Sequence, residues 1–178
     1  MKKLNRKGFT LVELLAVIVI LAIIVGIVFP QIMNSINNSR ISAIHTSAKE
    51  IVRWWENSIS ADALETDESK KQIPSDILSK VTTGWKCMDE ITSDTGKNLF
   101  EITGLSAADL VTNGSGGNDD ALANFPDTNN ISSTTCSAIR YNSAGGVDVL
   151  LVAKSGGKYY ISGKITYGYS NDANGVTK

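Results

Sequence analysis

An apolar run of 21 residues near the beginning of the chain, residues 9–29, constrains the fold more than any other feature. Only three of its residues are not strongly apolar: Thr10, Glu13 and Gly26. After Glu13, no charged residue follows until Arg40, so 26 consecutive positions carry no charge. At about 1.5 Å per residue, a helix over this run is about 30 Å long, which matches the hydrocarbon core of a bilayer. A core helix of a soluble domain is disfavoured, because this run has no polar face to turn toward water.

The eight residues before the run are basic, and they predict which side of the membrane each end occupies. They include four cations and no acid: Lys2, Lys3, Arg6 and Lys7. Such a flank stays cytoplasmic, so the chain after residue 29 is expected outside. The run leads into Phe29-Pro30-Gln31, without the small residues that signal peptidase needs, and a cleaved secretory signal is therefore disfavoured. A permanent anchor and a specially processed membrane subunit remain.

Glu13 distinguishes these two possibilities. A carboxylate within an apolar span costs several kcal/mol (about 2.5–3.5 on insertion scales) unless it is neutralised or paired, so it marks a candidate functional site. One interpretation places Glu13 near the cytoplasmic interface, where it reaches water or Lys7. The other requires a cation at membrane depth. Cleavage between Gly8 and Phe9 would create one, because the new α-amino group would lie one helical turn from Glu13.

Residues 7–14, KGFTLVEL, resemble the processing motif of type IV prepilins and of the related pseudopilins of type II secretion and competence systems. The resemblance implies that a prepilin peptidase cuts after Gly8 and that Phe9 receives a methyl group. It also implies that Glu13 pairs with the amino terminus of a neighbouring subunit during filament assembly. At the level of motif it covers about residues 1–35, and beyond them only the architecture is similar.

The helix is predicted to continue past the apolar run, to about residue 61. Pro30 lacks an N–H and clashes with the preceding turn, and Gly26 lies one turn earlier, so we expect a kink or weakened hydrogen bonds there. Alternatively, the helix ends at Pro30. Continuation is favoured because apolar residues keep helical spacing on one face: Ile32, Met33, Ile36, Ile44, Ala48, Ile51, Val52, Trp55 and Ile59. Trp54 is expected at a subunit contact or at the edge of the domain, and the single histidine, His45, at the margin of this face.

The remaining residues, 62–178, are predicted to form a globular head. Period-two alternation and Gly pairs predict strands at 139–141, 147–153 and 158–169, with a hairpin turn at 155–157. Gly163 interrupts the last strand where we expect the long helix to approach. Short helices are predicted near 75–81 and 106–111, although residues 99–102 could equally form a strand. The expected fold is α+β, with the long helix packed on an antiparallel sheet over about 136–169.

Two cysteines, Cys87 and Cys136, lie in the part expected outside the cytoplasm, where disulfides persist. We therefore expect a bond between them, with two buried free thiols as the alternative. Asp119, Asp120 and Asp127 form a weak Ca²⁺ candidate that lacks EF-hand spacing, and no metal site is predicted.

The chain has no recognisable catalytic motif, and its charge distribution is that of a precursor. Phosphate-binding loops, HExxH pairs and nucleophile elbows are absent from the sequence, so no enzyme activity or cofactor is expected. The formal net charge is −1, but without residues 1–8 it is −5, from 13 basic and 18 acidic side chains. This acidity argues against bulk binding of nucleic acid.

Together these features predict a pilin made as a precursor. The expected parts are a cleaved leader (1–8), a long helix (9–61, of which 9–29 span the membrane or form the filament core) and an extracellular head (62–178). The resemblance implies prepilin peptidase, other pilin subunits and the cytoplasmic membrane as partners, and adhesion to an unspecified host or surface ligand, or twitching motility, as roles. A pseudopilin of a secretion or DNA-uptake system is one alternative. An uncut membrane-anchored binding domain is the other.

Overall fold

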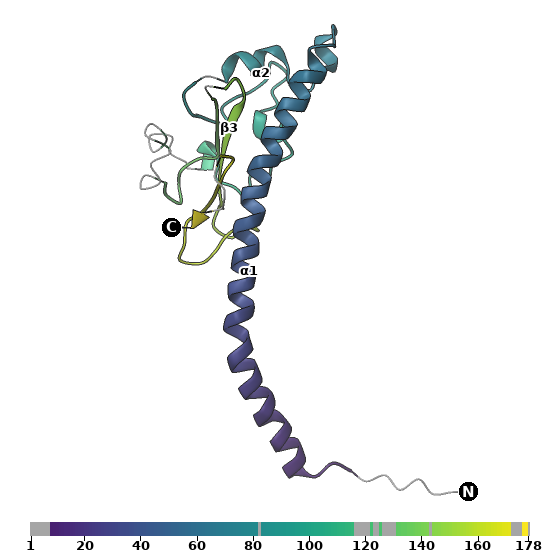
Figure 1. Cartoon of the computed structure of the whole chain (residues 1–178), viewed down its shortest axis with the longest axis vertical. Helices are drawn as coiled ribbons and strands as arrows, with labels where there is room; N and C mark the ends of the chain where they lie inside the picture. The colour runs from purple at the N-terminus through teal and green to yellow at the C-terminus, as the bar shows by residue number, and fades with distance from the viewer. Residues whose placement is uncertain are drawn as a thin grey trace, which may run out of the picture. The chain divides into compact units, whose positions relative to one another are not determined.

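The computed structural model describes residues 8–81, 83–115, 122, 125, 131–142, 144–171 and 176–177. It divides the chain into two compact units, residues up to Asn38 and Ser39–Lys178, which are described separately below. From here on the second unit is called the head; it contains the predicted head, 62–178, together with residues 39–61 of the long helix. The elements are α1 (Leu11–Asp62), η1 (Glu68–Lys70), α2 (Ser75–Lys80), β1 (Lys86–Cys87), α3 (Leu99–Ile102), η2 (Asn113–Ser115), β2 (Ala138–Tyr141), β3 (Val147–Val152), β4 (Thr166–Tyr169) and β5 (Val176–Thr177) (Figure 1).

Helix α1 has 52 residues and continues through Pro30, so the alternative that the helix ends there is wrong. It is the one helix among the described residues that is long and apolar enough to cross a membrane. Before Asn38 its large apolar side chains are exposed, whereas in the head one face of the same helix is buried. The sequence periodicity predicted this change, because polar residues first alternate with apolar ones beyond Pro30.

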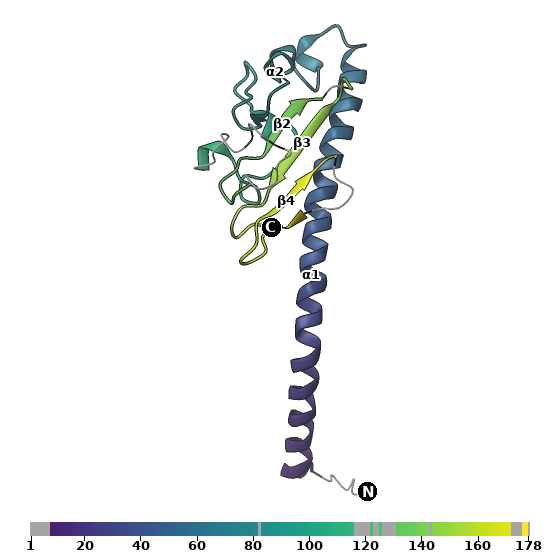
Figure 2. The same ribbon diagram turned by 60° about the vertical axis from the view of Figure 1, so that its left-hand side comes forward.

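The head contains a five-stranded antiparallel sheet with the strands in chain order, β1 to β5 (Figure 2). The register pairs Ile139 with Val149, and Leu150 with Tyr169. The predicted α+β fold, a long helix packed on an antiparallel sheet, is confirmed. The sheet extends beyond the predicted range on both sides, because the short strands β1 and β5 lie outside residues 136–169.

The sheet is covered on both faces. On one face, the buried α1 residues Ile44, Ala48, Ile51 and Trp55 belong to the same apolar cluster as Val149. A second cluster includes Leu150 and Val152 from β3 together with Val111, which precedes η2, and with Leu122, Phe125 and Ile131 from the chain between η2 and β2. All six residues of β3 are buried, as expected for a strand with apolar layers on both sides.

Gly168 marks the closest approach of β4 to α1. A Cβ atom built on Gly168 would lie 2.5 Å from the backbone oxygen of Ile44, so only glycine fits there. The predicted position for this approach, Gly163, is wrong. Gly163 has open space around its Cα and a φ of +75°, a left-handed conformation that suits a turn.

The predicted long strand at 158–169 is also wrong over residues 158–165, since only Thr166–Tyr169 forms a strand. Residues 157–164 form turns, closed by the Tyr160 N–H on the Gly157 carbonyl and by a bridge between Ile161 and Lys164. The alternation of apolar and polar residues favours a strand here, but a contact with a distant part of the chain opposes it. The Lys158 N–H donates to Asp109 at 2.9 Å.

In the middle of the chain, the helix predicted near 75–81 is confirmed as α2. The helix predicted at 106–111 is absent, and Leu110 instead bridges to Ala153. The neighbouring residues Leu99–Ile102 form α3, so the strand considered there is wrong as well. Asn98 explains this outcome, because its side chain accepts the Glu101 N–H at 2.8 Å and caps the short helix.

Candidate processing and assembly site

The beginning of α1 is held by a reciprocal cap between Thr10 and Glu13. The Glu13 N–H donates to the Thr10 hydroxyl oxygen at 3.3 Å, and the Thr10 N–H donates to Glu13 Oε2 at 2.8 Å. The Thr10 hydroxyl also donates to the same Oε2, at 2.9 Å. This arrangement is a capping box, in which the N-cap residue and the third helical residue satisfy each other's N–H groups. The helix consequently begins at Leu11, two residues later than predicted.

The capping box sets the direction of the Glu13 carboxylate. The Thr10 N–H and the Thr10 hydroxyl both donate to Oε2, so the carboxylate lies at the N-terminal end of α1, where the helix dipole favours negative charge. Glu13 thus caps its own helix with one of its two carboxylate oxygens.

Gly8 and Phe9 lie directly before this cap, and both are exposed. Among the described residues, Phe9 is the most exposed large apolar residue, at 89%. A Cβ atom built on Gly8 would meet nothing within 4 Å. The fold of the chain itself therefore does not require glycine at position 8, and any need for glycine there must come from another molecule that acts on this segment.

The residues predicted as a weak point of the helix lie in the apolar part of α1. Gly26 has open space around it, and Pro30 lies inside the helix four residues later. Because proline lacks an N–H, one intrahelical bond is missing at this position. The predicted kink itself stays a prediction.

The large apolar side chains of this part of α1 are all exposed, by 39–89% for those between Phe9 and Met33. At about 25 cal/mol per Å² of apolar surface, so long an exposed apolar helix requires a bilayer or other protein chains around it.

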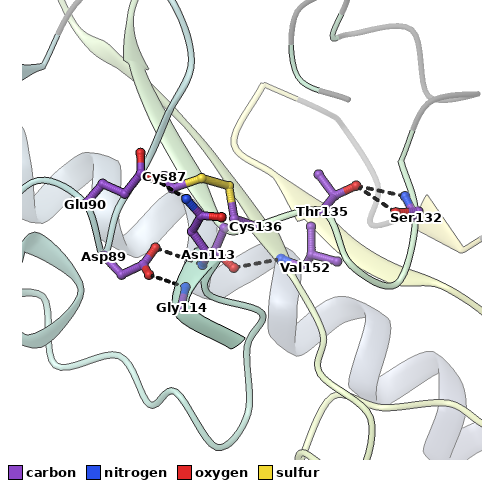
Figure 3. The surroundings of a disulfide bond; sticks show 10 residues. Cys87, Asp89, Glu90, Asn113, Gly114, Ser132, Thr135, Cys136 and Val152 are labelled. Atoms are coloured by element: carbon purple, nitrogen blue, oxygen red, sulfur yellow. Dashed lines mark hydrogen bonds between the residues drawn. A yellow bond between two sulfur atoms is a disulfide. The ribbon is translucent and has the colours of Figure 1, made fainter. Parts of the chain in front are cut away.

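In the head, the structure joins the two cysteines. Cys87 in β1 and Cys136 just before β2 form a disulfide with a Cα–Cα distance of 5.7 Å (Figure 3). The predicted bond is confirmed, and both half-cystines are fully buried. They meet because β1 pairs with β2, and Cys87 lies opposite Ala138.

Residues directly after Cys87 form hydrogen bonds with η2. The two carboxylate oxygens of Asp89 accept the N–H groups of Asn113 and Gly114, each at 3.1 Å (Figure 3). The Asn113 side chain also donates to Glu90. On the other side, Cys136 follows a turn in which the Ser132 N–H donates to the Thr135 hydroxyl at 2.9 Å. Residues 87–90 therefore anchor both the beginning and the end of the chain between η2 and β2.

Other predicted positions have these outcomes. His45 is buried in the head, and Trp55 is buried in the main apolar cluster. Trp54 is half-buried beside the same cluster. The weak Ca²⁺ candidate of Asp119, Asp120 and Asp127 lies outside the described residues. Within the described part of the chain, no group of three or more His, Cys, Asp and Glu side chains is placed to hold a metal ion.

Sequence reasoning missed the role of Thr10, although a signal was present. The pattern T-x-x-E at residues 10–13, directly before a long apolar run, is the sequence form of a capping box. The position of Glu13 within an apolar span indicates a role for its charge. The structure shows that Glu13 also caps the N-terminal end of the helix.

The comparisons with known proteins agree with this geometry. Residues 3–29 match the family described as the prokaryotic N-terminal methylation motif, which is the leader signature of type IV prepilins and pseudopilins. The match includes Gly8, Phe9, Thr10 and Glu13. Comparison with curated proteins and with solved structures found no match to this chain.

Proposed function

We propose that this chain, a precursor with the leader signature of type IV pilins and pseudopilins, is a pilin that assembles into an extracellular filament. The leader, residues 1–8, is removed after Gly8, and the new amino group of Phe9 is methylated. The mature subunit is held in the cytoplasmic membrane by the apolar part of α1 until it enters the filament. Its role is structural, and the filament serves adhesion or motility.

One observation carries the proposal: the exposed apolar part of α1 has a single carboxylate, Glu13, and that carboxylate is oriented at the N-terminal end of the helix. In a bundle of parallel copies the apolar surfaces of α1 bury one another, which removes the cost of their exposure. A charged Glu13 in such a bundle needs a cation, because an unpaired buried charge is strongly destabilising. The Phe9 amino group of a neighbouring copy is a cation at the right depth.

The capping box supports this role for Glu13. It fixes the carboxylate through Oε2 before assembly, so less side-chain entropy is lost when a neighbour binds Oε1. A methylated amine keeps its positive charge and still donates hydrogen bonds. Pairing of the amine with Glu13 would then set the axial register between adjacent subunits.

Two substitutions at Glu13 separate its charge from its capping role. Glu13→Gln keeps the capping box, since glutamine serves equally at the third helical position, but it removes the charge. Glu13→Ala removes both. We expect each variant to be cleaved and to remain in the membrane, with sheared filament yield reduced at least about 10-fold, the equivalent of 1.4 kcal/mol in an equilibrium. Normal filaments from Glu13→Gln would show that charge pairing is not required.

The processing step is tested at Gly8. Because Gly8 has open space around it, Gly8→Ser is compatible with the fold, and a defect can be assigned to the peptidase. We expect intact mass to show residues 1–8 retained in Gly8→Ser and lost, with one added methyl group, in the unsubstituted chain. An uncut unsubstituted chain in cells that contain a prepilin peptidase would favour a permanent membrane anchor.

Electron microscopy of material sheared from cells separates a pilin from a pseudopilin. Long surface filaments made of this chain are expected for a pilin. A cleaved and methylated chain that stays with the cell envelope, and whose loss blocks protein secretion or DNA uptake, would assign it to a pseudopilin.

A further inference from the structure

A cavity in the head lies beside Trp54, the half-buried tryptophan of α1. It has a volume of about 290 Å³ and lies between three segments that are distant in the sequence: α1 from Ser47 to Trp54, residues 103–110, and Lys158 with Tyr159. All three segments belong to the head, so the cavity is formed within one compact unit. The processing and assembly steps proposed above do not use it.

Contacts between the three segments hold the walls of the cavity in place. The hydroxyl groups of Ser47 and Tyr159 lie 2.9 Å apart, which ties α1 to the third segment. The Lys158 N–H donates to the Asp109 carboxylate at 2.9 Å. A Cβ atom built on Gly157 would lie 2.6 Å from the Asp109 Cα atom, so the second and third segments are in direct contact. Because these contacts join the walls without another molecule, the cavity is preformed, as ligand sites usually are.

The lining of the cavity combines one aromatic surface with groups that form hydrogen bonds. Trp54 contributes an indole, which has a large apolar face and an N–H at its edge. Glu50 lies one helical turn before Trp54, on the same side of α1, and is exposed. The other two segments contribute Asp109 and Lys158, whose charged groups are 4.0 Å apart. The Lys158 side chain remains 62% exposed.

This combination of groups disfavours several classes of ligand. The ammonium group of Lys158 opposes a cationic ligand, and the carboxylates of Glu50 and Asp109 oppose an anionic one. An entirely apolar ligand would take these three charged groups out of water without giving them new partners, which is costly. A neutral molecule that has both an apolar face and several hydroxyl groups avoids all of these penalties.

We propose that the cavity binds one neutral sugar residue, a pyranose ring at the end of a glycan. The C–H face of the ring stacks on the Trp54 indole, and adjacent hydroxyl groups donate to the Glu50 carboxylate. The Lys158 ammonium group donates to a further hydroxyl oxygen. The volume lies just below the range of about 300–1,000 Å³ that is typical of sites for larger ligands, so it suits a single ring.

Such a site is weak alone and effective in a filament. One ring with a few hydrogen bonds gives low affinity, because its small contact area must offset the entropy lost on binding. A filament repeats the site on every subunit, and many sites that engage one glycan-coated surface bind it far more tightly than one site does. Binding of the sugar by the head does not depend on assembly, but its use in adhesion rests on the proposed function.

Nuclear magnetic resonance of the tryptophan indole N–H groups tests the site. The full chain, isotope-labelled at its three tryptophans and held in micelles of a sugar-free detergent, is titrated with D-glucose, D-galactose, D-mannose and N-acetyl-D-glucosamine. At least one of these sugars should shift the Trp54 signal until it saturates. The Trp85 signal should stay in place, because Trp85 packs against the second apolar cluster.

Substitution of Glu50 tests its hydrogen bonds to the sugar. Glu50→Gln should weaken binding about 10-fold, measured by the Trp54 signal, because the bonds to a charged acceptor are lost. The matched control is Glu56→Gln, which changes another exposed carboxylate of α1 that does not line the cavity. It should bind the sugar as the unsubstituted chain does.

Trp54→Ala removes the reporter signal, so its binding is measured as retention of the chain on beads that carry the same sugar. We expect retention to be lost, while the Trp85 signal shows that the head is still folded. Trp54→Phe keeps an aromatic face and should retain part of the binding. Lys86→Ala is the control, because Lys86 is exposed on β1 and does not line the cavity.

Charged probes complete the test. Choline represents a cationic ligand, and D-glucuronate represents an anionic one. A Trp54 shift that saturates at lower concentration with either of them than with any neutral sugar would overturn the proposal. The absence of a Trp54 shift with all four neutral sugars would also overturn it, and so would equal binding by Glu50→Gln and the unsubstituted chain.

The outcomes separate this site from the proposed function. Filaments whose subunits bind none of the sugars would overturn the site and leave the proposed function intact. A processed chain that binds a sugar at Trp54 but forms no filaments would overturn the proposed function and leave the site intact.

Discussion

The two halves of α1 belong to one continuous helix but meet opposite environments. In the first, residues 11–38, large apolar side chains point in all directions and are exposed. In the second, residues 39–62, the apolar side chains of Ile44, Ala48, Ile51 and Trp55 are 0–5% exposed. The polar residues His45 and Ser58 are buried beside them, and the charged residues of this half lie outside the buried face. The apolar surface of the first half is exposed and can contact other molecules. The apolar face of the second half is buried in the core of the head.

This difference shows where each half obtains its stability. The head buries its helix face against its own sheet, so its folding is intramolecular and is expected to be cooperative. The apolar half has no such partner among the described residues, and its environment must be supplied by lipid or by other protein chains. Substitutions of the same type in the two halves should therefore have different consequences.

Substitution of alanine for one glycine in each half of the molecule gives the largest expected difference in the stability of the head. Gly168→Ala places a Cβ atom 2.5 Å from the Ile44 oxygen, so the head should lose more than about 4 kcal/mol of unfolding free energy. Gly26→Ala meets nothing within 4 Å and improves helix propensity, so head unfolding should be unchanged. Denaturant unfolding of the full chain in detergent, followed by tryptophan fluorescence, measures both. A stable Gly168→Ala head would contradict the close approach of β4 to α1.

Loss of the disulfide should affect the head alone. Cys87→Ser with Cys136→Ser opens a loop with a sequence separation of 49 and should lower head stability by about 4 kcal/mol in the chain-entropy model. Leader cleavage at Gly8 should proceed normally, because the site lies in the other unit. Urea melts and intact mass of the same sample provide the two measurements. A head with unchanged stability would show that the hydrogen bonds of Asp89 and the sheet suffice to hold this region.

Truncation of one isoleucine in each half compares the two faces directly. Ile51→Ala removes a side chain that is 5% exposed and should cost the head about 3 kcal/mol. Ile24→Ala removes one that is 50% exposed within this chain, and head unfolding should not respond. Filament yield should show the reverse order of sensitivity if the apolar half packs only in the assembly. Equal loss of head stability in both variants would contradict the division into two units.

The smallest effect we expect is a change in how the stability of the head depends on pH. The hydroxyl and N–H groups of Ser69 lower the pKa of Asp67. Since this pKa is lower in the folded state, Asp67 contributes stability above its unfolded pKa, about 3.9, and loses that contribution as the pH falls through the folded value. Ser69→Ala should therefore give a slightly flatter decline of melting temperature in acid. An unchanged acid profile would mean that the exposed bond is too weak to matter.

The candidate processing and assembly site could be located from the sequence because it is local. Gly8, Phe9 and Glu13 lie within one short motif, and the roles that the resemblance gives them stay predictions. The role of Thr10 was equally local and could have been predicted from its spacing to Glu13. The cavity beside Trp54 was not predictable, because it is lined by α1, residues 103–110 and Lys158, which come together only in the folded head.

The sequence by itself determined the long helix, its apolar first half and the α+β class of the head, since these depend on periodicity and on uninterrupted apolar length. Only the tertiary structure decided which glycine lies against the backbone of α1 and where β4 begins. Alternation of Tyr159, Ile161 and Ile165 favoured a strand, but contacts of this segment with Asp109 and α1 produced turns. Local patterns specify the conformations that a segment can adopt, and contacts between distant residues select among them.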